Sequence, residues 1–386
     1  MSKYIPLSVP SLKGNEWKYV KECLDTEWVS SAGKYVDMFE QKTAEYTRAK
    51  YAVACVNGTS ALQVSLRLAG VQLGDEVIVP SLTFIAPVNT ITYLGATPVF
   101  MDADQYYNID IEKIIEFIKS ETVFKDGITV NKTTRNKISA IIPVHVWGNA
   151  VQLDDLVTLC EERNIVIIED ASESLGTFYK EGKYKGKYTG TIGKLGCLSF
   201  NGNKIITTGG GGMILTDDED LAEKAKYLTT QAKDDPVRYI HDEVGYNFRL
   251  TNIQAALGVA QLEQLPSFLK RKKEIHGQYK KAVETIEGLF IADGPEYANN
   301  NHWINLIKID SEVFGKDGKC LMDKLEKKGI QTRPVWALNH LQRPYRNCQN
   351  YKIEFAEALV SNSLCLPSST NLSNKNIATI INYLPT

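Results

Sequence analysis

Residues 199–213 read Ser199-Phe200-Asn201-Gly202-Asn203-Lys204-Ile205-Ile206-Thr207-Thr208-Gly209-Gly210-Gly211-Gly212-Met213. A strand-like run ends near Phe200, and a turn rich in asparagine and glycine then carries one lysine, Lys204. Four consecutive glycines follow, which permit positive φ angles and let the backbone approach a ligand closely. The lysine precedes the glycines, so the phosphate-binding pattern G-x-x-x-x-G-K-[ST] is absent. By itself the string also fits a tight hairpin with a solvated lysine.

Short apolar runs alternate with amphipathic stretches over the first two thirds of the chain. The apolar runs predict strands at Ala52–Val56, Glu76–Val79, Thr97–Met101, Ser139–Val144, Ile165–Glu169, Leu195–Phe200 and Met213–Thr216. The amphipathic stretches predict helices at Ser60–Leu68, Phe84–Leu94, Leu153–Arg163 and Leu221–Thr230. The strands are rich in valine and isoleucine and mostly lack alternation, which is typical of strands covered on both faces. The order predicts an α/β fold with a mainly parallel central sheet.

The pattern of apolar and polar residues changes after about residue 255. A long polar helix is expected from Leu262 through Ile286, followed by shorter mixed segments. We therefore expect a large α/β domain over residues 1–255 and a smaller C-terminal α/β lobe over 256–386. The polar segment Lys119–Lys137 is expected to be an exposed excursion between strands.

The composition is that of an ordinary globular protein. Of 386 residues, 43% are apolar and 23% charged, and the formal net charge is -2, so nothing indicates a nucleic-acid partner or a membrane surface. The seven cysteines have no metal-binding spacing, and no metal site is expected. The start of the chain does not have the pattern of a signal peptide, and no apolar run is long enough to span a bilayer. A cytoplasmic protein is expected.

Two further parts of the sequence contain residues that could bind a ligand or take part in catalysis. Asp170 follows the predicted strand Ile165–Glu169, and open α/β sheets bind ligands at the carboxyl ends of their strands. It could bind a metal, act as a base, pair with a cationic ring nitrogen, or only cap the next helix. The string Asn57-Gly58-Thr59-Ser60-Ala61-Leu62 lies between a strand and a helix. Its free amides and the helix dipole suit a phosphate, although a plain helix cap is the simpler interpretation.

Taken together, these elements predict one ligand. Pyridoxal phosphate needs a phosphate cradle, a carboxylate for its pyridinium nitrogen and a lysine for its aldehyde. Phe84 could offer an aromatic face to the ring, although most aromatic residues at strand ends are core residues.

The chain resembles the sugar aminotransferases of the DegT/DnrJ/EryC/StrS group, which have the aspartate aminotransferase (type I) fold of pyridoxal-phosphate-dependent transferases. Besides the elements above, the resemblance rests on three separated strings in the right order. These are Gly95-Ala96-Thr97-Pro98-Val99-Phe100-Met101-Asp102, Pro143-Val144-His145-Val146-Trp147-Gly148 and Gly245-Tyr246-Asn247-Phe248-Arg249-Leu250. The similarity covers nearly the whole chain.

The resemblance implies a role for each matching residue. Lys204 is implied as the Schiff-base lysine, Asp170 as the partner of the ring nitrogen and Phe84 as the stacking residue. The phosphate ligands implied are Gly58, Thr59, Ser60 and Ser199, with Asn247 reaching the phosphate of a neighbouring subunit, which implies a homodimer with shared active sites. Glu173 stands near the phenolic oxygen of the cofactor, where many members have glutamine; glutamate can donate there only when protonated.

The resemblance also implies the reaction. Some relatives that dehydrate their substrate have histidine in place of Lys204, so the lysine favours transamination. The strings Asn201–Thr208 and Thr332–Trp336, and the segment near Phe124–Gly127, are similar to those of aminotransferases on the bacillosamine and legionaminic acid routes. The implied acceptor is a UDP- or GDP-linked 4-keto-6-deoxy-N-acetylhexosamine, and the implied donor is L-glutamate. Alternatives are 3-amination, dehydration, or a regulatory protein that binds the cofactor without turnover.

Five residues are candidates for binding the substrate. His145 and Trp147 could line the pocket, although a hydrogen-bonded histidine beside a strand is as plausible. Arg333 and His340 could contact a nucleotide diphosphate, where a surface arginine is the simpler alternative. Ser31 lies in a segment similar to one near the active site of the family, which could equally be a turn.

Overall fold

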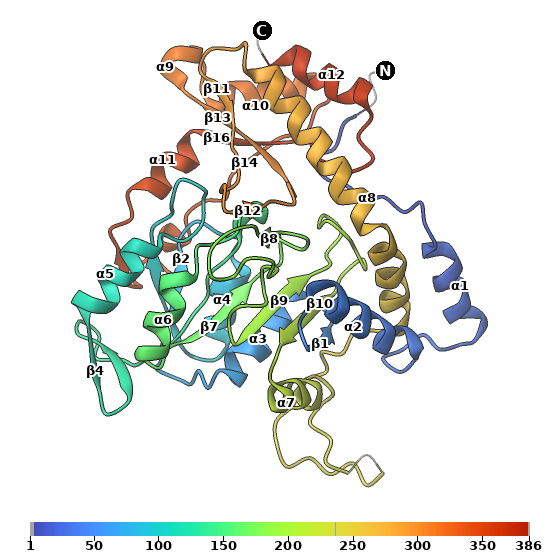
Figure 1. The fold of residues 1–386 in the computed structure, drawn as a ribbon, viewed down its shortest axis with the longest axis vertical. Helices are drawn as coiled ribbons and strands as arrows, with labels where there is room; N and C mark the ends of the chain where they lie inside the picture. Colours follow the sequence, from blue (N-terminus) through green and yellow to red (C-terminus); the bar gives the residue numbers. More distant parts are fainter. Residues whose placement is uncertain (1–3, 236, 385–386) are drawn as a thin grey trace.

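The central sheet has eight strands within residues 4–235 and 237–384, the part of the chain that this computed structural model describes. The strands follow the order β1-β10-β9-β7-β6-β2-β3-β15 (Figure 1). Their bounds are β1 (Tyr51–Cys55), β2 (Glu76–Pro80), β3 (Thr97–Met101), β6 (Ile138–Ile141), β7 (Val166–Asp170), β9 (Leu195–Ser199), β10 (Gly212–Thr216) and β15 (Asn350–Tyr351). Met1–Lys3, part of the stretch expected not to form a signal peptide, lie outside the described residues.

Only β10 runs against the other strands of this sheet, because it pairs antiparallel with both β1 and β9. The turn that carries Lys204 joins β9 directly to β10, and antiparallel neighbours can be joined in this way without a crossover helix. Near the end of that turn, a Cβ added to Gly212 would come within 2.4 Å of the Asn57 carbonyl oxygen. One glycine of the run therefore lets two chain segments approach each other.

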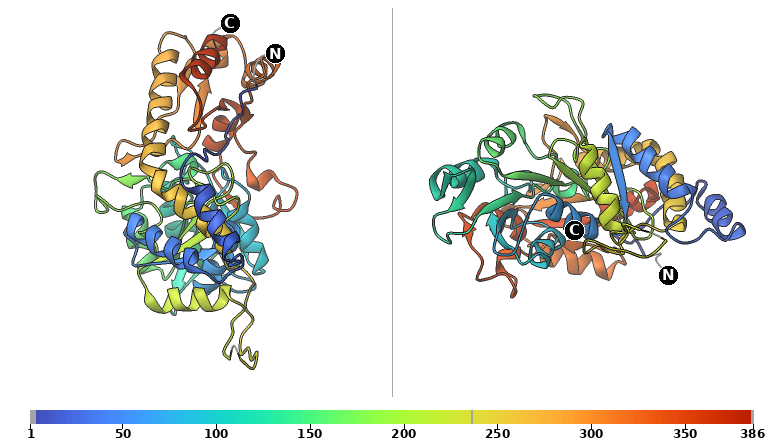
Figure 2. Two further views of the ribbon diagram at one scale, coloured as in Figure 1. Left: turned by 90° about the vertical axis from the view of Figure 1, so that its right-hand side faces the viewer. Right: turned by 90° about the horizontal axis from the view of Figure 1, so that it is seen from below.

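Helices cover both faces of the central sheet (Figures 1 and 2). They are α2 (Lys34–Thr47), α3 (Gly58–Leu68), α4 (Ala86–Tyr93), α5 (Ile111–Glu121), α6 (Asp154–Glu162) and α7 (Glu219–Thr229). The helix α1 (Glu16–Asp25) packs instead on α8 (Asn252–Val283), at the outer edge of the molecule (Figure 1). Along β2, Val77 and Val79 enter the core beneath α3 and α4, whereas Ile78 enters the core beneath α5 and α6. Successive strand residues point to opposite faces, which explains why these strands are continuous apolar runs in the sequence.

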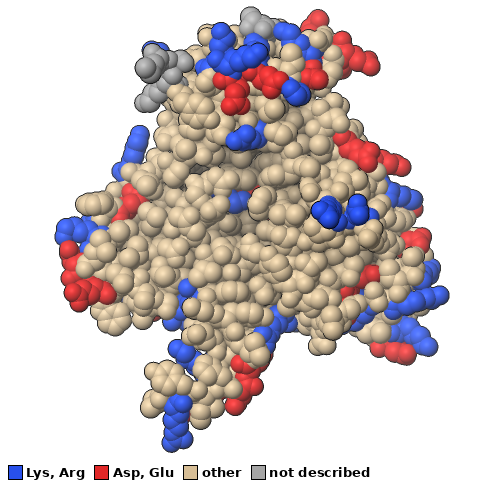
Figure 3. Space-filling view, turned by 180° about the vertical axis from the view of Figure 1, so that it is seen from behind, with Lys and Arg blue, Asp and Glu red and all other residues tan. Residues whose placement is uncertain are grey.

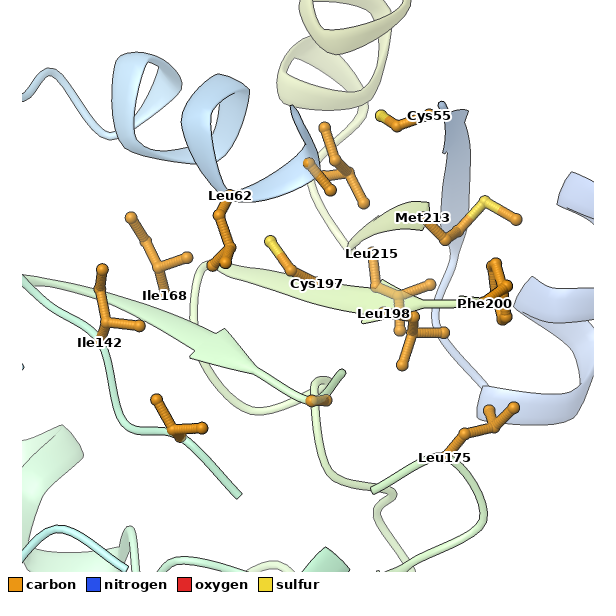
Figure 4. Close-up of a cluster of buried hydrophobic side chains, with 14 of the residues drawn as sticks. Cys55, Leu62, Ile142, Ile168, Leu175, Cys197, Leu198, Phe200, Met213 and Leu215 are labelled. Carbon is orange, nitrogen blue, oxygen red and sulfur yellow. The ribbon is translucent and has the colours of Figure 1, made fainter. Parts of the chain in front are cut away.

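The helix α3 packs on the sheet within the first of these two cores. Leu62 of α3 points toward Ile168 of β7 and Cys197 of β9 (Figure 4), and all three side chains are buried. This packing places the start of α3 beside the ends of β7 and β9.

One helix, α8 (Asn252–Val283), spans both domains. It starts ten residues before the expected Leu262, because Thr251 and Gln254 form a capping box. Its first half joins the core of the large domain through Val259, and its second half joins the core of the small domain through Tyr279. The expected boundary at residue 255 therefore falls in the first turn of this helix.

The small domain is built on the antiparallel sheet β11-β13-β16-β14. Its elements are β11 (Leu289–Ile291), β13 (Asn305–Ile309), α9 (Ser311–Phe314), α10 (Gly318–Lys327), β14 (Arg333–Pro334), α11 (Phe355–Ser361), β16 (Ser363–Leu366) and α12 (Asn374–Tyr383). The chain crosses between the domains more than once: Ile5 pairs with Ile330 and packs in the core of the small domain, whereas β15 extends the large sheet.

The remaining elements are short. The expected excursion Lys119–Lys137 contains a hairpin of β4 (Thr122–Lys125) and β5 (Ile128–Asn131). A second small sheet pairs β8 (Phe178–Tyr179) with β12 (Ala298–Asn299), and the 3-10 turns are Val146–Gly148 and Asn339–Leu341. Among the helices of the described chain, none is both long and apolar enough to cross a membrane.

Candidate active site

The predicted site residues come together at one edge of the central sheet. Asp170 is the last residue of β7, and Ser199 is the last of the neighbouring strand β9. The helix α3 begins at Gly58, three residues after β1 ends, and β1 has the same direction as β9. Since parallel strands end at the same edge, the sequence places Asp170, the start of α3 and the Lys204 turn side by side.

A cavity of about 640 Å³ opens at this edge. It is lined by most of the residues predicted to bind the cofactor: Gly58, Thr59, Phe84, Asp170, Glu173, Ser199 and Lys204. Of the predicted substrate residues, Trp147 and Arg333 also line it. The size suits a ligand larger than a single amino acid.

Lys204 reaches into the cavity between an acidic and an aromatic side chain. Its Nζ lies 3.5 Å from Glu173 Oε1 and 4.1 Å from the centre of the Trp303 ring. The Lys204 side chain is 14% exposed and that of Glu173 only 4%. Trp303 also donates a hydrogen bond from Nε1 to the Asn203 carbonyl oxygen at 2.6 Å, so it holds the backbone of the lysine turn.

Glu173 is an unusual carboxyl group. Burial raises its pKa to about 7, with a further raising contribution from the Asp170 charge, although the Lys204 ammonium and the Trp147 amide both act to lower it. The Trp147 amide donates to Glu173 Oε2 at 2.8 Å. The carboxyl can therefore gain or lose a proton near neutral pH, next to the lysine.

The start of α3 forms a cradle suited to an anion. Asn57 caps the helix by accepting a hydrogen bond from the Ser60 amide at 2.7 Å. The amides of Gly58 and Thr59 precede the first turn of intrahelical hydrogen bonds, and such amides bind phosphate groups. A Cβ added to Gly58 would lie 2.9 Å from Ser199 Cβ. The glycine thus lets the helix approach the strand end closely.

Aromatic side chains form one wall of the cavity. Trp147 stacks on Trp336 with ring centres 4.5 Å apart, and Phe84 meets Trp336 edge to face at 6.2 Å. Phe84 is 53% exposed. Two lining residues each have a buried polar atom without a hydrogen-bond partner among the described residues, namely Trp147 Nε1 and Thr83 Oγ1. Buried polar groups are nearly always paired, so these two atoms are hydrogen-bonding groups of the wall that a ligand could satisfy.

His145 does not reach the cavity. Its side chain is fully buried, with Nε2 2.8 Å from Glu169 Oε2 and Nδ1 accepting a hydrogen bond from the Val151 amide. Because Nδ1 accepts, Nε2 carries the proton and donates to Glu169. Of the two interpretations that the sequence left open, the structure shows the hydrogen-bonded histidine beside a strand.

Four other predicted residues also lie outside the cavity lining. His340 is buried and pairs through Nδ1 with Ser81 Oγ at 2.6 Å, and burial lowers its pKa. Ser60 is buried behind the first turn of α3, Ser31 lies in the segment between α1 and α2, and Asn247 is exposed. His340 is buried and does not line the cavity because the short turn 339–341 packs its ring against Phe100 in the core.

The sequence reasoning missed Trp303 and Thr83. Trp303 lies just before β13, about a hundred positions from Lys204, in the string Asn301-His302-Trp303-Ile304-Asn305, and packs in the core of the large domain. No local pattern connects a tryptophan there to the lysine turn. Thr83 stands directly before Phe84, so its place beside a strand end was the available signal.

The residues of the cavity fit pyridoxal phosphate. Lys204 offers an amine, Asp170 a buried carboxyl group and the start of α3 an anion cradle, and all three groups that the cofactor requires line one cavity. The fold and the cavity therefore define a pyridoxal-phosphate-dependent transferase with the aspartate aminotransferase fold.

Comparison with known proteins identifies the family. The sequence model of the DegT/DnrJ/EryC1/StrS aminotransferase family matches residues 10–385, and the chain belongs to this family. It is 39% identical over 376 residues to the GDP-perosamine synthase of Escherichia coli O157:H7, covering 97% of this chain and 96% of that protein. It is 36% identical over 391 residues to the putative pyridoxal phosphate-dependent aminotransferase EpsN of Bacillus subtilis strain 168, covering 100% and 96% of the two chains.

Solved structures agree with this assignment. The crystal structure of DesI with its TDP-sugar product superposes with a TM-score of 0.88 at 27% identity, covering 100% of this chain and 93% of DesI. The protein is thus an aminotransferase whose cofactor is pyridoxal 5'-phosphate.

Proposed function

We propose that the enzyme transfers the amino group of L-glutamate to C4 of a nucleotide-linked 4-keto-6-deoxy sugar and so forms the 4-amino sugar. The proposed acceptor is the N-acetylhexosamine form, linked to UDP or GDP. The observation that carries the proposal is the position of Lys204, whose Nζ lies in the cavity 3.5 Å from Glu173 Oε1. An amine placed there can take a proton from one carbon and return it to another.

The cavity residues that would hold the cofactor each have a role in this reaction. Pyridoxal phosphate supplies, when bound, a reactive aldehyde and an electron-accepting ring. The amides of Gly58 and Thr59 would hold its phosphate, with Ser199 at the neighbouring strand end. Asp170 would keep a proton on the ring nitrogen, and Lys204 would move a proton between the substrate carbon and the cofactor.

The aromatic wall and Arg333 are proposed to bind the sugar nucleotide. Arg333 is exposed at the cavity on β14, where a guanidinium can pair with a diphosphate. Trp147 Nε1 is a buried donor that a sugar oxygen could satisfy. Several relatives act on nucleotide sugars by name, and those names differ in the nucleotide: GDP in the E. coli enzyme and TDP in DesI.

The test is to assay the purified enzyme with L-glutamate and the UDP- and GDP-linked 4-keto sugars, with and without the N-acetyl group, in parallel. The expected result is one strongly preferred acceptor, with the new amine at C4 of the product by NMR. An amine at C3, or a dehydrated product, would support the two alternative reactions. No transfer to any of these sugars, while glutamate still converts the bound cofactor, would refute the proposed acceptor.

We further propose a homodimer in which Asn247 of one subunit reaches the cofactor phosphate of the other. Asn247 is exposed, and the segment that follows α7 projects away from the body of the molecule (Figures 1 and 2). Val237 and Val244 in this segment are 84% and 74% exposed. The back of the molecule is a broad surface with few charged side chains (Figure 3), and depletion of charge is typical of interface cores.

Mixing two inactive variants tests the shared site. Lys204→Ala and Asn247→Ala, unfolded and refolded together, are expected to regain activity, because mixed dimers contain one intact site. Sedimentation analysis of the wild type should show a dimer. A monomer, or variants that stay inactive after mixing although dimers form, would contradict the proposal.

A further inference from the structure

Glu173 and Lys204 form a buried pair in the cavity. Glu173 follows β7 by three residues, Lys204 lies on the turn between β9 and β10, and their reactive atoms are 3.5 Å apart. Both side chains are largely shielded from water. In such surroundings a pair of neutral groups avoids the cost of burying two charges. The position of the shared proton decides whether the Glu173–Lys204 pair is charged or neutral.

The backbone of Trp147 fixes the orientation of the carboxyl group. Trp147 has φ 51° and ψ 27°, a left-handed conformation that costs energy for a residue other than glycine. In this conformation its amide donates to Glu173 Oε2 at 2.8 Å, which leaves Oε1 facing Lys204 Nζ. A glutamine at position 173 would have to give its oxygen to the Trp147 amide and turn its NH₂ group toward the lysine. Glutamate alone presents an acceptor to both neighbours.

We propose that Glu173 is the proton partner of Lys204: Oε1 takes the proton that the Lys204 ammonium must lose before the amine can react, and later returns it. In this step one N–H bond of the ammonium breaks and one O–H bond forms on the carboxyl group. A positive and a negative charge disappear together, and no electron is transferred. The inference rests on the aminotransferase chemistry of the family and on no particular sugar.

The groups around the pair are consistent with this exchange. The ionisable groups that act on Glu173 are Lys204 and Asp170 at the end of β7, and Glu173 acts in turn on Cys365 of β16. Burial, and then the charge of Glu173, raises the pKa of the Cys365 thiol, which therefore stays protonated. With its own pKa raised to about 7 by burial, the Glu173 carboxyl is present in both forms near neutral pH.

The test follows cofactor loading by the full-length protein, which involves neither amino donor nor sugar. Cofactor-free wild type and Glu173→Gln are mixed with pyridoxal phosphate, and the visible absorbance of the bound cofactor gives a loading rate at each pH. The wild-type rate should rise with pH through a midpoint near 7, as the carboxyl becomes able to accept a proton. Glu173→Gln should lack this rise and load about tenfold or more slowly at neutral pH. Glu181→Gln, an exposed carboxyl change, should behave as wild type.

Infrared spectroscopy gives a readout that does not depend on activity. Burial also raises the pKa of Asp104 to about 7, so the Glu173 signal is read from the wild-type spectrum minus the Glu173→Gln spectrum, in which the Asp104 band cancels. This difference spectrum of the cofactor-free proteins should contain a carboxylic acid band that titrates with a midpoint near 7. A variant that loads with the wild-type pH profile, or a difference spectrum in which no such band titrates, would overturn the proposal. If the glutamine variant failed to fold by circular dichroism, Glu173→Asp would replace it, and its shorter side chain should likewise weaken the rise.

Discussion

Glu169→Gln should destabilise the protein strongly, because Glu169 is the centre of a fully buried hydrogen-bond cluster. Its Oε1 accepts the amides of Ile192 and Gly193, each at 2.6 Å. Its Oε2 accepts the Gly190 amide and the His145 ring proton, each at 2.8 Å. Neither the Glu169 nor the His145 side chain is exposed. A glutamine keeps one of the two oxygens, so two of these donors would face an NH₂ group.

The magnitude follows from the number of donors that lose an acceptor. A buried donor left unpaired costs about 1–3 kcal/mol, so two cost about 2–6 kcal/mol. The histidine cannot relieve the conflict by moving its proton, because Nδ1 already accepts the Val151 amide. Urea unfolding of the cofactor-free protein, followed by circular dichroism, measures the loss. The exposed control Glu162→Gln should stay within about 0.5 kcal/mol of wild type.

The pH dependence of this stability difference has a definite sign. Burial acts to raise the pKa of Glu169, but the His145 bond and the loop amides outweigh it and hold the pKa below its usual 4.5. Because the folded carboxyl has the lower pKa, its contribution is present above the unfolded pKa and is lost as the pH falls through the folded pKa. The difference in the free energy of unfolding between wild type and Glu169→Gln should therefore become smaller at acidic pH. A variant as stable as wild type, or one that only binds the sugar more weakly, would refute a structural role for this cluster.

Three further substitutions test the site and its support. Lys204→Ala should lack the absorbance band of a cofactor linked to lysine, even if the cofactor still binds without that bond, and should lose activity about a thousandfold or more, measured as kcat. Asp170→Asn should keep the fold, since an amide oxygen can still accept the Ser172 amide at 3.0 Å, while kcat falls about a hundredfold or more. Asp102→Asn should lower the free energy of unfolding, measured in urea, by about 3 kcal/mol, because it removes the buried charge that pairs with Lys113 at 2.6 Å.

The sequence predicted the strands of the large domain well, for a physical reason. Thr97–Met101 was expected as a strand and is β3, because a strand buried on both faces is a short apolar run with few alternatives. The beginning of α8 was missed, since its first turns are packed by small residues such as Ala255 and Ala256 and look unlike the polar helix that follows.

The candidate site was predictable only in part. Asp170 and Gly58 stand directly at strand ends, and the topology of an α/β sheet alone brings such positions to one edge. His145 follows β6 by four residues and His340 lies in the turn 339–341, but the two side chains are buried and pair with Glu169 and Ser81. The direction of a side chain depends on the local backbone, which the pattern of residues does not specify.

The sequence by itself therefore determined the α/β order and the cofactor, and it singled out Lys204 as the lysine proposed to carry that cofactor, because these depend on local patterns and on the edge where strands end. Only the tertiary structure decided what surrounds Lys204. Trp303 comes from a segment about a hundred positions away, and Glu173 is oriented by the strained backbone of Trp147. Contacts between distant segments follow from packing of the whole core, which fixes distances that no local pattern contains.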